Sequence, residues 1–163
     1  MITNRIHRHQ NGFTMLELVI IIIIIGILSI SANTRWGSTS ISTDGQAEQI
    51  ANDIRYAQAL AMTRNDRYRF VRVSATTYQI LNSAGTAVAL ADGTTTTLGT
   101  GLSFGTLSNL PNNLVAFDGE GAPYTTTGTP GTALAATASI PVTSGGNTST
   151  ITITPQTGRV TVT

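Results

Sequence analysis

The residue best placed to do chemistry is Glu17, because it is the only charged residue between Phe13 and Ala32. That run is 20 residues long and mostly apolar, with six consecutive isoleucines. About 20 such residues are what a helix needs to cross the hydrocarbon core of a bilayer. A carboxylate there is costly, so an acid within a membrane helix indicates a functional site with a partner.

A short basic and polar leader, residues 1–12, precedes the apolar run and carries Arg5 and Arg8. The other flank offers only Arg35, so the positive-inside rule favours a cytoplasmic N-terminus and an exported domain. Two alternatives for this pattern stay open. One is a signal anchor that is never cut. The other is a secretory signal peptide cut near Ser29 to Ala32, although its apolar core is usually only about 7–15 residues long.

The order of a leader ending in Gly12, an aromatic Phe13 and then Glu17 in an apolar run resembles a type IV prepilin signal. The resemblance implies that a membrane peptidase cuts after Gly12 on the cytoplasmic side and methylates the new amino terminus of Phe13. It also implies that Glu17 guides assembly by pairing with the terminal amine of a neighbouring subunit.

Residues suited to catalysis are missing from the exported part. Both histidines, His7 and His9, lie in the leader, and the chain has no cysteine. Ser-His-Asp chemistry and histidine-based metal sites are therefore unavailable to the mature chain. Asp118 and Glu120, with Asp92, carry oxygen ligands of the kind that calcium prefers, but we interpret them as solvated acids in turns. We predict no enzyme activity, no cofactor and no metal site.

The basic residues of the domain gather in one stretch, at Arg64, Arg67, Arg69 and Arg72. A sheet face with Arg67, Arg69 and Arg72 near Tyr68 and Tyr78 could contact nucleic-acid phosphates. The alternative is ion pairing with Asp53, Asp66 and neighbouring subunits.

The length of the chain predicts one exported domain, and its charge balance is close to neutral. Without the leader and the apolar run, about 130 of the 163 residues remain, enough for a single domain. All nine basic residues are arginine, and without the leader seven arginines stand against eight acids, a net charge of −1 before the termini. This balance gives no general argument for nucleic-acid binding.

From Asp44 the spacing of apolar residues is helical, with a stripe at Ala47, Ile50, Ala51, Ile54, Ala57 and Ala61. Thr43 with Gln46 is typical of a capping box and predicts a fresh helix start. An unbroken helix from Phe13 to Thr63 would instead be about 75 Å long.

Alternating patterns after residue 66 predict strands. Residues 67–73 and 76–81 form an expected hairpin, and residues 102–104 and 114–117 are further strands. Residues 148–154 and 159–162 form a final hairpin. Proline cannot donate to a ladder, so residues 140–142 are predicted to be an edge strand.

A helix followed by this hairpin resembles the GspH/FimT-type minor pseudopilins and the related mannose-sensitive-haemagglutinin minor pilins. Residues 55–61, 117–123 and 157–160 carry the likeness. A DNA-binding branch of this family has Gly-Arg-x-Arg near its C-terminus, where this chain has Gly158-Arg159-Val160-Thr161. The second arginine is missing, so Arg159 alone is carried over as a possible DNA contact.

Together these features predict an α+β pilin-like fold, in which a long N-terminal helix packs its C-terminal half on antiparallel sheet. We expect a leader at residues 1–12, a transmembrane or filament-core helix at 13–32, the rest of the helix at 33–64 and a β-rich domain at 65–163. The resemblance implies a minor pilin of a type IV pilus or type II secretion pseudopilus. Its partners would be other pilin subunits, the prepilin peptidase and the inner membrane before assembly. The alternatives are a DNA-binding minor pilin and an uncleaved anchor of an exported binding domain.

Overall fold

The computed structural model describes residues 15–24 and 39–163, and the side chains of residues 15–24 and 43–163. The chain divides into two compact units, Met1–Ser38 and Thr39–Thr163. Gly12 and Phe13 lie outside the described residues, as does the stretch 25–38 that would link the two parts of a long helix.

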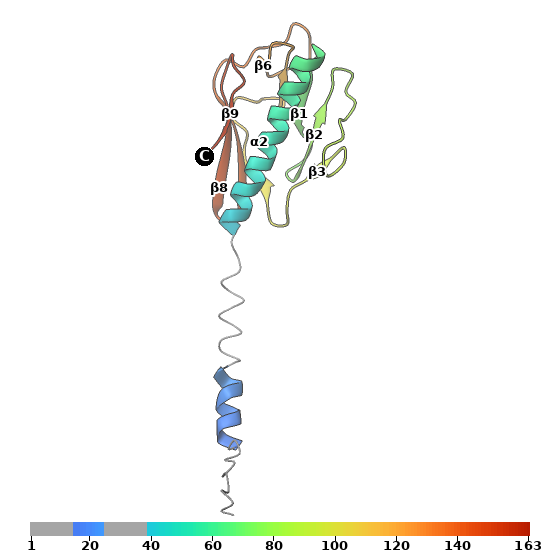
Figure 1. Ribbon diagram of the computed structural model, residues 1–163. Helices are drawn as coiled ribbons and strands as arrows, with labels where there is room; N and C mark the ends of the chain where they lie inside the picture. The colour runs from blue at the N-terminus through green and yellow to red at the C-terminus, as the bar shows by residue number, and fades with distance from the viewer. Residues whose placement is uncertain (1–14, 25–38) are drawn as a thin grey trace, which may run out of the picture. The chain divides into compact units, whose positions relative to one another are not determined.

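The second unit is built on helix α2, Thr39–Arg64 (Figure 1). The six apolar residues of the predicted stripe are all fully buried, which confirms the helical spacing. The predicted helix start at Thr43 is wrong, because α2 is already helical at Thr39 and Thr43 is buried within it. A threonine at this position contributes to the buried face rather than to a cap.

A five-stranded antiparallel sheet lies on one side of the core, in the order β3-β2-β1-β5-β6. The predicted hairpin is confirmed, because β1 pairs with β2 and Phe70 of β1 lies opposite Ile80 of β2. The predicted strand at residues 114–117 is β5, which pairs with the other edge of β1. The strands are β1 (Tyr68–Arg72), β2 (Thr77–Leu81), β3 (Thr96–Thr97), β5 (Leu114–Phe117) and β6 (Pro123–Tyr124).

A second, four-stranded antiparallel sheet has the order β4-β7-β8-β9. The final hairpin is confirmed by the pairing of β8 with β9. Ser139 and Thr143 of β7 and Thr150 and Thr152 of β8 are only partly buried, while alternate residues such as Ile140, Ile151 and Ile153 are fully buried. The strands are β4 (Ser103–Phe104), β7 (Ala138–Ser144), β8 (Asn147–Ile153) and β9 (Val160–Val162).

Strand β7 is an interior strand, so its prediction as an edge strand is wrong. Pro141 is tolerated because of its register. The carbonyl of Pro141 accepts a bond from Gly105 N, on the side of β4, and Ser139 bonds Ser108 on the same side. The missing N–H of Pro141 therefore points away from β8, and the ladder between β7 and β8 loses no hydrogen bond.

Helix α2 contacts strands of both sheets, and the core lies between them. Its alanines allow a close approach to the strands, while larger residues of the sheets fill the remaining space. Phe70, Tyr78 and Phe104 form an aromatic cluster with ring centroids 5.3 to 6.2 Å apart, and this cluster joins the two sheets. The unit is thus the expected α+β arrangement of one helix on antiparallel sheets.

Candidate functional site

Residues 15–24 form a helix that contains Glu17. The nine apolar side chains of this segment are 42–87% exposed, and Glu17 is exposed among them. Contiguous apolar surface of this kind marks a site for a protein partner or a membrane. Neither helix within residues 15–24 and 39–163 meets the length and hydropathy that crossing a membrane requires.

The predicted arginine surface is not one open patch. Arg67 places its guanidinium carbon 4.3 Å from the centroid of the Tyr124 ring and donates a hydrogen bond to the Gly128 carbonyl. Arg72 donates to the Gly105 carbonyl at 3.0 Å. Arg67 and Arg72 are thus bound to loops of their own domain, while Arg69 lies half-buried on β1 and Arg159 lies exposed beside β9 in the other sheet.

The aromatic residues predicted beside these arginines are buried. Tyr68 is 5% exposed and Tyr78 is fully buried, so neither offers a ring for a base to stack on. The Tyr78 hydroxyl donates to Asp53 Oδ2 at 2.5 Å. Burial, followed by this contact with Asp53, raises the pKa of Tyr78 well above its ordinary value.

The predicted ion pairs of this arginine group with Asp53 and Asp66 are also absent within the part of the chain that the structure describes. The ion pair formed there joins Arg55 to Glu48 on α2, at 2.7 Å. Asp66 instead accepts hydrogen bonds from the Arg67 backbone N–H and the Ser83 hydroxyl, each at 2.7 Å.

The three acids that could supply calcium ligands, Asp92, Asp118 and Glu120, do not form one cluster. Asp118 Oδ1 accepts hydrogen bonds from the backbone N–H groups of Glu120 at 3.0 Å and Ala122 at 2.9 Å. These bonds stabilise the turn between β5 and β6. A hydrogen bond with Asp118 raises the pKa of Tyr124. Asp92 lies elsewhere, beside Gln49 on α2. Among the residues described, no three histidine, cysteine or acidic side chains cluster as metal ligands would.

Gln58 of α2 is a structurally important residue that the sequence pattern alone did not single out. Its side-chain amide donates to the carbonyls of Gly121 at 2.8 Å and Thr157 at 3.1 Å. One residue of α2 thereby holds a turn from each sheet. The glycines at 121 and 158, both with positive φ, are the signal that could have indicated such close packing.

Comparisons with known proteins agree on the class of the chain. Residues 7–33 match the model of the prokaryotic N-terminal methylation motif, and residues 46–163 match that of type II transport protein GspH. A comparison with curated proteins found no match.

Two crystal structures of the type IV minor pilin FimU from Pseudomonas aeruginosa PAO1 share the fold. One has a TM-score of 0.55 at 14% identity, over 77% of this chain and 91% of FimU. The other has a TM-score of 0.50 at 15% identity, over 73% and 90%. The GspH model covers well over half of the chain and adjoins a methylation motif. The chain therefore belongs to the GspH family and is a structural subunit of the minor pilin and pseudopilin class.

Proposed function

We propose that this minor pilin is cut between Gly12 and Phe13, is methylated on Phe13, and enters a type IV pilus or type II secretion pseudopilus through Glu17. The observation that carries the proposal is the joint presence of the N-terminal methylation motif and the GspH domain in one chain. Residues 13–32 then anchor the subunit in the inner membrane, with the N-terminus in the cytoplasm, before they enter the filament core. In this scheme the leader is residues 1–12, and residues 33–64 carry the helix into the domain at 65–163.

The charge pattern supports the proposed partner of Glu17. After cleavage the chain carries no basic side chain before Arg35. The amine of Phe13 is then the only cation that a neighbouring copy can offer at the depth of Glu17. A carboxylate that leaves water gains stability when it meets an opposite charge, so pairing with that amine would favour assembly.

Cleavage is tested by the N-terminal sequence and intact mass of the protein recovered from its host cells. We expect a chain that begins at Phe13 and carries one added methyl group. Because the sequence contains no lysine, an amine-selective reagent can report only the chain terminus. Gly12→Ala should keep the leader attached. Recovery of an unmodified chain that begins at Met1 from wild-type cells would disprove the proposed processing.

The role of Glu17 is tested with Glu17→Leu, with Glu120→Gln as a control acid on the exposed surface. Glu17→Leu should remain in the membrane fraction and lose incorporation into sheared filaments. Glu120→Gln should assemble like the wild type. Normal incorporation of Glu17→Leu would rule out the pairing while leaving the cleavage proposal intact.

A further inference from the structure

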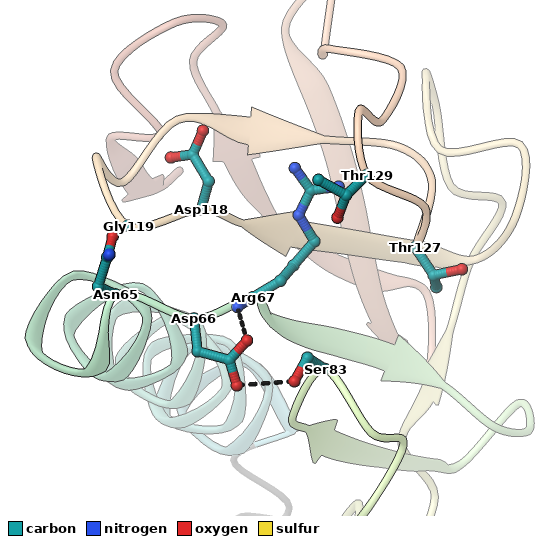
Figure 2. Close-up of a pocket in the computed structure, with 8 residues that line it drawn as sticks. All are labelled: Asn65, Asp66, Arg67, Ser83, Asp118, Gly119, Thr127 and Thr129. Atoms are coloured by element: carbon teal, nitrogen blue, oxygen red, sulfur yellow. Dashed lines mark hydrogen bonds between the residues drawn. The ribbon is translucent and has the colours of Figure 1, made fainter.

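A cavity of about 350 Å³ lies at the C-terminal end of α2, where four separate segments converge (Figure 2). They are the junction of α2 with β1, the loop after β2, the turn between β5 and β6, and the loop that follows β6. Its volume is at the lower end of the range typical of small-molecule sites. The lining residues are Asn65, Asp66, Arg67, Ser83, Asp118, Gly119, Thr127 and Thr129.

Internal hydrogen bonds hold the walls of this cavity. Asp66 bonds the Arg67 backbone and the Ser83 hydroxyl, so the α2–β1 junction and the loop after β2 are joined. The Arg67 side chain extends toward Thr129 in Figure 2, and its bond to Gly128 holds the loop that supplies Thr127 and Thr129. The shape of the cavity therefore depends on contacts within the domain and exists before a ligand arrives.

The lining selects a polar ligand. All eight lining residues are polar or glycine, so no aliphatic or aromatic residue lines the cavity. The nearby ring of Tyr124 is covered by Arg67. Binding would rest on hydrogen bonds to carboxylate, amide and hydroxyl groups.

The charges of the lining argue against ionic ligands. Two carboxylates, Asp66 and Asp118, stand against the one guanidinium of Arg67, so phosphate and carboxylate ligands are disfavoured. Arg67 disfavours a cation in turn, and the described residues hold no group of three metal-ligating acids or histidines. The ligand that fits is neutral and rich in hydroxyl donors. Each oxygen of Asp66 accepts one bond within the domain and keeps a second lone pair for a ligand, whereas Asp118 Oδ1 already accepts two backbone bonds and leaves only Oδ2 to offer.

We propose that this cavity binds one neutral sugar residue, either a free hexose or the terminal residue of a glycan, through the carboxylates of Asp66 and Asp118 and the side chains of Asn65 and Thr127. Without a stacking ring the affinity should be weak, with a Kd on the order of 1–10 mM. This binding goes beyond assembly and does not depend on leader cleavage, because the cavity belongs wholly to the folded domain.

The test uses the full chain in a detergent without a sugar headgroup, with glucose, galactose and mannose as separate probes. Saturation-transfer NMR should detect at least one of these hexoses at about 10 mM, a concentration that matches the expected affinity. Thr127→Trp places a bulky indole at a lining position and should abolish the signal. Thr148→Trp is the matched control, because Thr148 is exposed at the start of β8 and does not line the cavity.

Asp66→Asn provides a second variant that keeps the shape of the side chain. It should weaken binding about 3–10-fold, because a charged acceptor becomes neutral. Thermal melting checks that each variant is folded. No signal from any hexose with the wild type, equal binding by Thr127→Trp, or preference for glucuronic acid over the neutral hexoses would overturn the proposal. A glycan array then distinguishes the two forms of the ligand. Binding to the array indicates that the cavity recognises the terminal residue of a glycan. An NMR signal without array binding indicates that it recognises a free hexose.

Discussion

A Cβ atom at Gly158 would lie 2.6 Å from the side-chain Nε2 of Gln58 and 2.7 Å from the Gly121 carbonyl oxygen. The turn between β8 and β9 approaches α2 this closely because Gln58 donates hydrogen bonds to both Gly121 and Thr157. The two turns belong to different sheets. Gln58 therefore links the helix to both sheets at one point, beside the cavity-bearing end of the domain.

Gly158→Ala should destabilise the domain by about 2–4 kcal/mol, since it combines backbone strain with a clash against a backbone carbonyl. The backbone at Gly158 has φ +62°, which alanine adopts at a cost. Gly146→Ala is the control, because Gly146 has φ +91° and no atom lies within 4 Å of an added Cβ. Chemical denaturation of both variants separates the strain from the clash. Equal losses of stability would show that the contact with Gln58 is unimportant.

Gln58→Glu should destabilise the domain by about 1–3 kcal/mol at neutral pH, because a carboxylate cannot donate to the two carbonyls and leaves them unpaired. Gln79→Glu serves as the control, since Gln79 Nε2 meets the Thr95 hydroxyl, which can donate to a carboxylate instead. The free energy of unfolding of both variants is compared with the wild type. A similar, small effect in the two variants would contradict the proposed link.

The local elements of the fold could be predicted from the sequence because each has its own period. The stripe from Ala47 to Ala61 follows the helix repeat, and the alternation along β8 follows the strand repeat. The start of α2 could not be predicted in this way. Thr43 and Gln46 have the spacing of a cap, yet burial of Thr43 against the rest of the domain decides its role.

Features that join distant segments left no periodic signal. The place of Pro141 in an interior strand depends on which side of β7 faces β4, and sequence spacing does not report this. The arginines were grouped because they are close in the chain, but Arg67 and Arg72 bind loops that lie about 30 to 60 residues away. Sites assembled from several loops, such as the cavity near Asp66 and Asp118, emerge only in three dimensions.

Arg67→Leu should loosen the loop between Thr125 and Thr132, because the guanidinium supplies both the hydrogen bond to Gly128 and the contact with Tyr124. We expect faster amide hydrogen exchange in this loop and a loss of about 1–2 kcal/mol in the free energy of unfolding. Arg64→Leu is the control, because Arg64 is exposed at the end of α2. Unchanged exchange in the loop of Arg67→Leu would show that the loop is held by its own Thr125–Thr132 hydrogen bonds.

Asp53 should make the domain less stable as the pH rises through the weakly acidic range. Burial is the largest cause that raises the pKa of Asp53 above its ordinary value of 3.8, the nearby charge of Asp92 raises it further, and the hydrogen bond from Tyr78 opposes both. The folded chain therefore keeps a proton on Asp53 at pH values where the unfolded chain has lost it. Stability that is present below pH 3.8 is then lost as the pH rises through the folded-state pKa.

Asp53→Asn removes this titration while its side-chain oxygen can still accept from Tyr78. Urea unfolding of the wild type and Asp53→Asn should show the variant gaining stability relative to the wild type between about pH 4 and pH 7. Asp44→Asn, at an exposed position of α2, should follow the wild type over the same range. A relative stability of Asp53→Asn that stays constant or falls with pH would mean that the hydrogen bond from Tyr78 outweighs burial at Asp53.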